Sequence, residues 1–336
     1  MVARGRERLP IRGGLLDSRR FLLVNPGKPV RTPSCYPAAV TSLDRDNAAA
    51  DVLVVGEALV DVVTTADGVT RDHPGGSGAN VAVALGRLGR PVRYAASFAD
   101  DARGRSLAAH LADSGVVMAC DPHVLDHTST AQATIAADGS ATYVFDLEWK
   151  LGEIAVGTPR FVHIGSLAPV LSPGAETVVA LLDGLPDSTR VLYDINMRPT
   201  LTGTGQEIVS RIERAAAYAD VVKASDEDLE TLYPGIGLDK AAARLLELGA
   251  GAVAVTRGGD GASWITETER IDVEAEKVTV VDTIGAGDTF SAGLVDALWD
   301  DFDRDRREVL AHGVRAAAVT VSRAGANPPT RAELEG

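Results

Sequence analysis

Apolar residues along the chain fall into short runs rich in Val and Ile, which alternate with longer runs rich in Ala and Leu. The short runs contain few polar residues, as is typical of strands that are buried on both faces. Strands that alternate with helices in this way predict a parallel sheet covered by helices. We expect strands at residues 52–56, 92–97, 161–164, 190–193, 221–223 and 252–256. Helices are expected at residues 79–88, 103–114, 175–182, 206–218, 226–233, 239–248, 286–299 and 306–322.

One segment has a different period. Residues 129–136 and 141–147 alternate apolar and polar positions around an Asp-Gly pair at 138–139, which predicts an antiparallel hairpin. Residues 61–70 contain a second turn at 66–68. We expect these two segments to form a small sheet that projects over one edge of the main fold.

The first fifty residues differ in composition from the rest. They carry nine basic residues against four acidic ones, with scattered Pro and Gly and no sustained period. Residues 1–50 are therefore expected to be an N-terminal extension that is disordered. The preferred alternative is that translation begins downstream, near Val52. A transit peptide is disfavoured because Pro and Gly interrupt an amphipathic helix.

Composition excludes several classes of protein. The 336 residues are 45% hydrophobic, which is enough for a sizeable core, but no apolar run approaches the roughly 18 residues of a membrane span. A net charge of −14 argues against nonspecific binding of nucleic acid. Cys35 and Cys120 are far apart and belong to no Cys/His cluster, so neither a disulfide framework nor a zinc site is indicated. We expect a cytoplasmic globular protein.

The sequence VDTIGAGDTF, from Val281 to Phe290, carries the first candidate chemistry. Gly285, Ala286 and Gly287 precede a helix, so their backbone N–H groups lie at a helix N-terminus, where anions bind. Asp288 is negatively charged and would repel a phosphate if its only role were to bind it. It could instead accept the proton of a hydroxyl that attacks the phosphate. The alternative is that the glycines only shape a tight loop and that Asp288 only complements the helix dipole.

A second motif, GGSGANVAVALGRLG, begins at Gly75, while neither a P-loop nor a G-x-G-x-x-G motif occurs. This stretch resembles the N-terminal signature of the ribokinase/phosphofructokinase-B family of carbohydrate kinases, and DTIGAGDTF is similar to their C-terminal signature. The resemblance covers residues 51–330. It implies a ribokinase-like three-layer α/β/α sandwich with a mostly parallel central sheet and a small β lid. The lid elements are expected at about residues 61–74 and 115–150.

The resemblance also implies roles for individual residues. It assigns the base to Asp288 and the anion hole to Gly285, Ala286 and Gly287. It assigns sugar binding to Asp61, Gly75, Gly76 and Asn80. It places Lys223, Ser225, Thr256, Arg257, Gly258, Gly261 and Asn327 near the nucleotide, with Asp228 near Mg²⁺ and Asp282 near K⁺. Ser225 and Asp228 stand where the family has Asn and Glu, which puts their roles in doubt.

Three stretches look more like fructokinases than ribokinases, at residues 163–167, 194–199 and 222–229. In the second, Asp194 and Arg198 follow a strand, at the edge where open α/β sheets bind ligands. They are expected to contact the sugar or to form a buried Asp–Arg pair that supports the loop. Ser77 and Leu59 replace a Lys and a sugar-binding Asn of ribokinases, so ribose is disfavoured. We interpret His163 as a structural residue, and Tyr143, Phe145 and Trp149 as lid packing, with one of these aromatics reaching the sugar as the alternative.

These features predict an ATP-dependent sugar kinase that uses Mg²⁺ and K⁺, with fructose as the expected acceptor and a homodimer as the expected assembly. Two alternatives stay within the family: a 2-keto-3-deoxygluconate kinase or a nucleoside kinase. A third belongs to another class, a sugar-binding regulator without catalysis. No nucleic-acid or membrane partner is expected.

Overall fold

The computed structural model describes residues 51–136 and 141–336, and the expectations for residues 1–50 and for the turn at 138–139 lie outside them. Within the described residues nine strands form a large sheet in the order β13-β12-β11-β10-β9-β8-β1-β4-β5. All strands from β11 to β5 in this order run parallel, while β12 and β13 are antiparallel at one edge. The strands are β1 (Val52–Val55), β4 (Val92–Ala95), β5 (Val116–Met118), β8 (Phe161–Gly165), β9 (Arg190–Asp194), β10 (Val221–Ser225), β11 (Val253–Thr256), β12 (Ala262–Ile265) and β13 (Arg270–Val273). The six expected strands are confirmed, and the three that were missed, β5, β12 and β13, lie at or next to the edges of the sheet.

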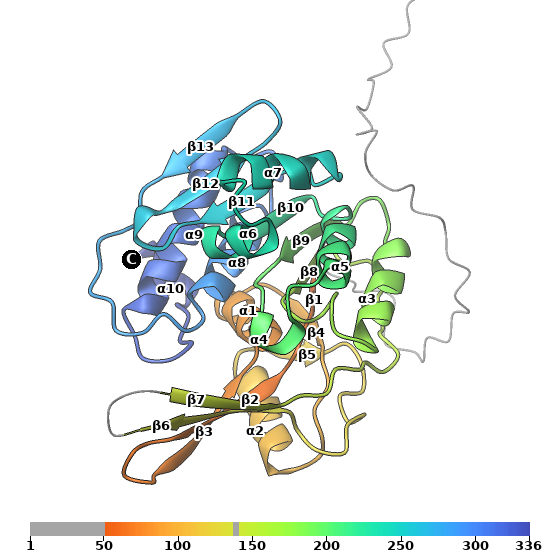
Figure 1. Cartoon of the computed structure of the whole chain (residues 1–336), viewed down its shortest axis with the longest axis vertical. Coiled ribbons are helices and arrows are strands. Elements are labelled where there is room, and N and C mark those ends of the chain that lie inside the picture. The colour runs from red at the N-terminus through yellow and green to blue at the C-terminus, as the bar shows by residue number, and fades with distance from the viewer. Residues whose placement is uncertain (1–50, 137–140) are drawn as a thin grey trace, which may run out of the picture.

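Helices cover both faces of this sheet, so the expected three layers are present (Figure 1). One face carries α1 (Ser77–Arg87), α2 (Ala102–Asp113), α8 (Ala286–Ala297) and α9 (Arg306–Val321). The other carries α3 (Gly174–Asp183), α5 (Gln206–Ala216), α6 (Asp226–Leu232) and α7 (Leu238–Glu247). All eight expected helices are therefore confirmed. Short helices at α4 (Pro199–Thr202), η1 (Gly258–Asp260) and α10 (Arg331–Glu335) were not expected.

The central strand β1 is apolar at every position because its side chains enter two separate cores. In β1, Val52 and Val54 belong to the core beneath α1 and α8, whereas Leu53 and Val55 belong to the core beneath α3 and α5. This division explains why the strands appear in the sequence as uninterrupted apolar runs. No helix in the described ranges has the length and apolar character needed to cross a membrane.

A second sheet contains four strands in the order β3-β2-β6-β7. They are β2 (Leu59–Thr64), β3 (Thr70–Gly75), β6 (Thr130–Ile135) and β7 (Ala141–Asp146), and Figure 1 shows them as a separate unit beside the large sheet. The expected antiparallel pairing of β6 with β7 is present, and the second expected segment also forms an antiparallel pair, β2 with β3. The segment expected as lid at 115–150 is corrected at its start, because β5 pairs with β4 in the large sheet. The small sheet therefore receives only β6 and β7 from that segment.

Candidate functional site

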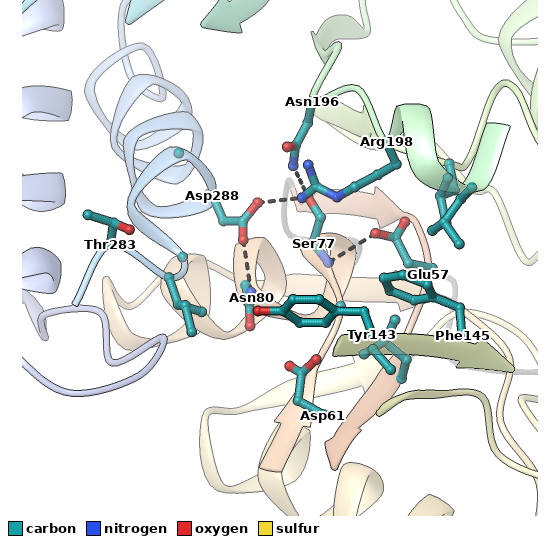
Figure 2. Close-up of a pocket in the computed structure, with 18 residues that line it drawn as sticks. Glu57, Asp61, Ser77, Asn80, Tyr143, Phe145, Asn196, Arg198, Thr283 and Asp288 are labelled. Atoms are coloured by element: carbon teal, nitrogen blue, oxygen red, sulfur yellow. Dashed lines mark hydrogen bonds between the residues drawn. The ribbon is translucent and has the colours of Figure 1, made fainter. Parts of the chain in front are cut away.

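A cavity of about 420 Å³ lies between the carboxyl edge of the large sheet and the small sheet (Figure 2). The sheet side contributes loops that follow β1, β8 and β9, together with the starts of α1 and α8. The small sheet contributes β2, β6 and β7, with Tyr143 and Phe145 on β7. This is the edge at which open α/β sheets bind ligands.

Asp288 lies at this cavity in the first turn of α8 and is only 7% exposed. Both of its carboxylate oxygens accept hydrogen bonds from α1. The Ser77 hydroxyl donates to Oδ1 at 2.7 Å, and the Asn80 amide Nδ2 donates to Oδ2 at 2.8 Å. The two motifs of the sequence analysis, more than 200 residues apart, thus meet at one carboxylate. Asn80, expected to bind sugar, here holds Asp288.

The two glycines before Asp288 are required by close packing. Gly285 has a left-handed backbone (φ 75°), and a Cβ there would lie 2.7 Å from the Cβ of Ala326. A Cβ at Gly287 would lie 2.9 Å from Nζ of Lys223. With glycine at both positions the start of α8 carries no side chain there, and helix N-termini of this kind bind phosphate. The Ala286 N–H donates to the carbonyl oxygen of Thr283 at 3.3 Å.

Lys223 and Asp194 form a buried ion pair beneath α8, with 3.0 Å between Nζ and Oδ2. Ser291 also donates to this Oδ2, at 3.0 Å. Burial raises the pKa of Asp194 to about 6, although Lys223 opposes the increase. Asp194 is fully buried and does not line the cavity, and its partner is Lys223 and not Arg198. Both expected roles of Asp194 are corrected, because the side chain at the end of β9 points into the α8 core.

Asp61, on β2, lies at the opposite wall of the cavity from α8 (Figure 2). Burial raises the pKa of its carboxyl, and His73 across the strand pair opposes this increase. A Cβ at Gly75 would overlap the Asp61 carboxylate, so Gly75 leaves room for that side chain. A Cβ at Gly76 would lie 2.5 Å from the carbonyl oxygen of Glu57. Gly76 lines the cavity, whereas Gly75 stands behind Asp61.

Glu57 also lines the cavity, although the sequence analysis did not identify it. Its Oε1 accepts the backbone N–H of Ser77 at 3.1 Å, and Oε2 has no partner among the described residues. Burial raises the pKa of Glu57 to about 7, and Arg198 opposes the increase. Arg198 is exposed and makes no ion pair within residues 51–136 and 141–336. A carboxylate directly after a buried strand was the sequence signal for Glu57.

The raised pKa of Glu57 predicts a specific pH dependence of stability. The folded state binds the Glu57 proton more tightly than the unfolded state, whose pKa is near 4.5. The resulting stabilisation is fully present below that value and is lost as pH rises through about 7, with a span of about 3 kcal/mol. Glu57→Gln lacks this titration, so its free energy of unfolding should rise relative to that of the parent between pH 5 and pH 8. Denaturant unfolding at both pH values measures the difference, and parallel pH profiles would contradict the prediction.

The residues expected near the nucleotide do not line this cavity. Ser225 caps α6 and forms a capping box with Asp228, whose Oδ1 also accepts the N–H of Met197. Arg257 pairs with Asp272 at 3.3 Å. Thr256 is the last residue of β11. Gly258 is the first residue of η1, and Gly261 follows that helix. Asn327 accepts a hydrogen bond from Arg87.

The two expected ion ligands accept backbone hydrogen bonds. Asp228 accepts the N–H of Ser225 through Oδ2. Asp282 accepts the N–H groups of Ile284 and Gly325 at 3.0 and 2.9 Å. It therefore joins the loop before α8 to the loop at residues 325–328, which we call the closing loop. No group of three or more His, Cys, Asp or Glu side chains that could hold a metal occurs in the part of the chain that is described.

The aromatic residues expected in the lid differ in their surroundings. Trp149 is buried and donates to the carbonyl of Ala168 at 3.1 Å, as expected of a packing residue. Tyr143 and Phe145 stack on each other with ring centroids 6.2 Å apart and line the cavity, a placement that lid packing alone did not predict. His163 is fully buried, and burial lowers its pKa to about 3, which agrees with a structural role.

The chain is similar to known sugar kinases over most of its length. The profile of the pfkB family carbohydrate kinases matches residues 49–333. A fructokinase of Rhizobium leguminosarum bv. trifolii is 36% identical over 273 residues, which cover 77% of this chain and 83% of the relative. A solved double mutant of the Vibrio cholerae O395 fructokinase, with fructose, ADP and a potassium ion bound, is 25% identical with a TM-score of 0.72, covering 85% of this chain and 97% of that one. The aminoimidazole riboside kinase of Salmonella enterica, solved with aminoimidazole riboside and an ATP analogue, is 29% identical with a TM-score of 0.72 and covers 85% and 98%.

These similarities confirm the ribokinase-like fold and the sugar-kinase activity that the two motifs predicted. The matched region includes the large sheet, the small sheet and both motifs that meet at Asp288. The chain belongs to the pfkB family of carbohydrate kinases, ATP-dependent enzymes that phosphorylate sugars.

Proposed function

We propose that the chain is a fructokinase, which transfers the γ-phosphoryl group of ATP to a hydroxyl of fructose. One observation carries the proposal: the Asp288 carboxylate and the uncovered N-terminus of α8 share a wall of a cavity whose opposite wall holds Asp61. A base and an anion-binding site must both lie at the reacting hydroxyl in phosphoryl transfer. The fructokinase names of several relatives support fructose as the acceptor.

In this mechanism Asp288 accepts the proton of the attacking hydroxyl. The Ser77 and Asn80 bonds orient the carboxylate, and the N–H groups at residues 285–287 stabilise negative charge that develops on the phosphoryl oxygens. Asp61 accepts hydrogen bonds from sugar hydroxyls and fixes which of them faces Asp288. The small sheet, with Tyr143 and Phe145, covers the sugar and excludes water, which limits hydrolysis of ATP.

We place ATP along the C-terminal half of the large sheet, near Thr256, Arg257, Gly258, Gly261 and Asn327. The glycine-rich start of α8 fits a phosphate group because no Cβ blocks it. Nζ of Lys223 lies beneath that start, 2.9 Å from where a Cβ on Gly287 would be, and Ser225 is the last residue of the same strand, β10. Mg²⁺ bound to the phosphates would neutralise charge on the leaving group and needs few protein ligands, so Asp228 can assist from the first turn of α6. Asp282 would hold K⁺ beside the closing loop.

We also propose that the enzyme is a cytoplasmic homodimer. Among the described strands β7 forms one edge of the small sheet, and Tyr143 and Val144 on it are about 60% exposed. An exposed edge strand of this kind can pair with a second copy. The two hairpins at residues 59–75 and 130–146 would then form both the lid and the interface.

One observation favours a second acceptor. Arg198 lines the cavity as an exposed cation without an ion pair in the described residues, and it suits a substrate carboxylate. This feature keeps 2-keto-3-deoxygluconate as the alternative acceptor. A nucleoside is the acceptor in one structural relative, the aminoimidazole riboside kinase.

The test is an ADP-release assay with ATP and Mg²⁺ on fructose, ribose, 2-keto-3-deoxygluconate, adenosine and fructose 6-phosphate. We expect kcat/KM for fructose to exceed that for each other acceptor by at least about 10²-fold, since a site built for given hydroxyls rejects substrates that leave them unpaired. Preference for 2-keto-3-deoxygluconate would replace the proposal. Absence of turnover on all acceptors would favour the regulator.

A further inference from the structure

Ser77 is the first residue of α1 and lies on the cavity wall with only 5% of its surface exposed. It contacts acidic groups on two sides. Its hydroxyl donates to Oδ1 of Asp288 at 2.7 Å, and its backbone N–H donates to Oε1 of Glu57 at 3.1 Å. A buried hydroxyl that donates to the carboxylate of the base is a candidate for a role in the reaction.

The direction of the Ser77 hydroxyl proton is determined by a third residue. The Asn196 amide Nδ2 donates to Ser77 Oγ at 3.0 Å, so Oγ accepts on that side. A hydroxyl carries one proton, which is therefore left for Asp288. Asn196 holds this position with a left-handed backbone (φ 35°), and the next residue, Met197, donates its N–H to Asp228 at 2.8 Å. The loop after β9 thus fixes the chain of hydrogen bonds from Asn196 through Ser77 to Asp288.

We propose that Ser77 is a positioning residue for phosphoryl transfer, whose hydroxyl, oriented by Asn196, holds the Asp288 carboxylate ready to accept the substrate proton. The inference rests on the proposed function of Asp288 as the base. Asn80 holds the other oxygen, Oδ2, so the two donors fix both the position and the rotation of the carboxylate.

The main experiment compares Ser77→Ala with the parent enzyme on the sugar that the parent phosphorylates. We expect kcat to fall about 10- to 100-fold, the value of one hydrogen bond to a charged group, with KM for sugar and ATP within about 2-fold. Ser77→Thr, which keeps the hydroxyl, should restore most of kcat. Ser263→Ala is the matched control, since Ser263 is a buried serine that donates to Asp272 on β13.

A substrate-free measurement separates this inference from the proposed function. The free energies of unfolding of the parent, Ser77→Ala, Asp288→Asn and the double variant form a cycle that measures the coupling between the two side chains. We expect the effects of the two single variants not to add, because both weaken the same hydrogen bond. Should Ser77→Ala fail to fold, Asn196→Gly, which tolerates the left-handed backbone, should give a smaller decrease in kcat.

Two results would overturn the inference: an unchanged kcat together with additive unfolding free energies in the cycle, or a rise in KM alone, which would make Ser77 a substrate contact. A parent enzyme that phosphorylates no sugar would overturn the proposed function instead, while the cycle would still report whether Ser77 holds Asp288.

Discussion

Asp288→Asn is expected to lower kcat about 10³- to 10⁴-fold while leaving ATP binding close to that of the parent. An amide cannot accept the substrate proton, and general-base catalysis contributes factors of this order. The change keeps the shape of the side chain, and Ser77 and Asn80 can still bond to it in part. The N-terminus of α8 is unchanged, so phosphate binding should persist.

The measurement is steady-state ADP release together with calorimetric titration of ATP. Asp303→Asn is the control, because this carboxylate is almost fully exposed and should give parental kinetics. Near-parental turnover by Asp288→Asn would remove Asp288 as the base. Loss of ATP affinity with unchanged kcat would make it a nucleotide ligand.

Asp61→Ala is expected to lower kcat/KM for the sugar about 10²- to 10³-fold, mainly through KM, with little change in KM for ATP. Asp61 is a largely buried carboxylate at the wall opposite α8, and it would pair with substrate hydroxyls that otherwise lose their hydrogen bonds to water. Sites built to bind a hydroxyl discriminate by factors of this size. Gly75 leaves the carboxylate its space, so the effect should be specific to the acid.

Initial rates at varied sugar and at varied ATP separate the two KM values. Asp67→Ala provides a matched control, since Asp67 lies in the exposed turn between β2 and β3, at the other end of the same hairpin. A decrease in kcat/KM that affects ATP equally would place Asp61 in lid closure and not in sugar recognition.

The sequence predicted the centre of the fold better than its edges. Central strands such as β1 and β8 are buried on both faces, so they appear as continuous apolar runs. The edge strand β13 alternates exposed and partly buried residues over four positions, a pattern too short to distinguish from a loop. The five-residue helix α10 is held by tertiary contacts from Arg331 to Leu88 and Asp296, which no local pattern reveals.

The candidate site was predicted in part for the same reason. Glycines beside an aspartate at a helix start are a local signal, and they identified Asp288. The pairing of Asp194 with Lys223 could not be inferred, because residues on neighbouring strands meet only once register is fixed. Glu57 and Ser77 were missed because their importance comes from contacts with distant segments: burial creates the raised pKa of one, and folding brings the other to Asp288.

The bond between Ser77 and Asp288 joins residues 211 positions apart, and this separation has a consequence for protein synthesis. A chain emerging from the ribosome exposes its sugar-side residues long before α8 leaves the exit tunnel. Until then the cavity lacks both its base and its phosphate-binding wall, so a partly synthesised chain can hold no complete catalytic apparatus. An arrested product that stops before α8 would accordingly consume no ATP, whatever sugar it might contact.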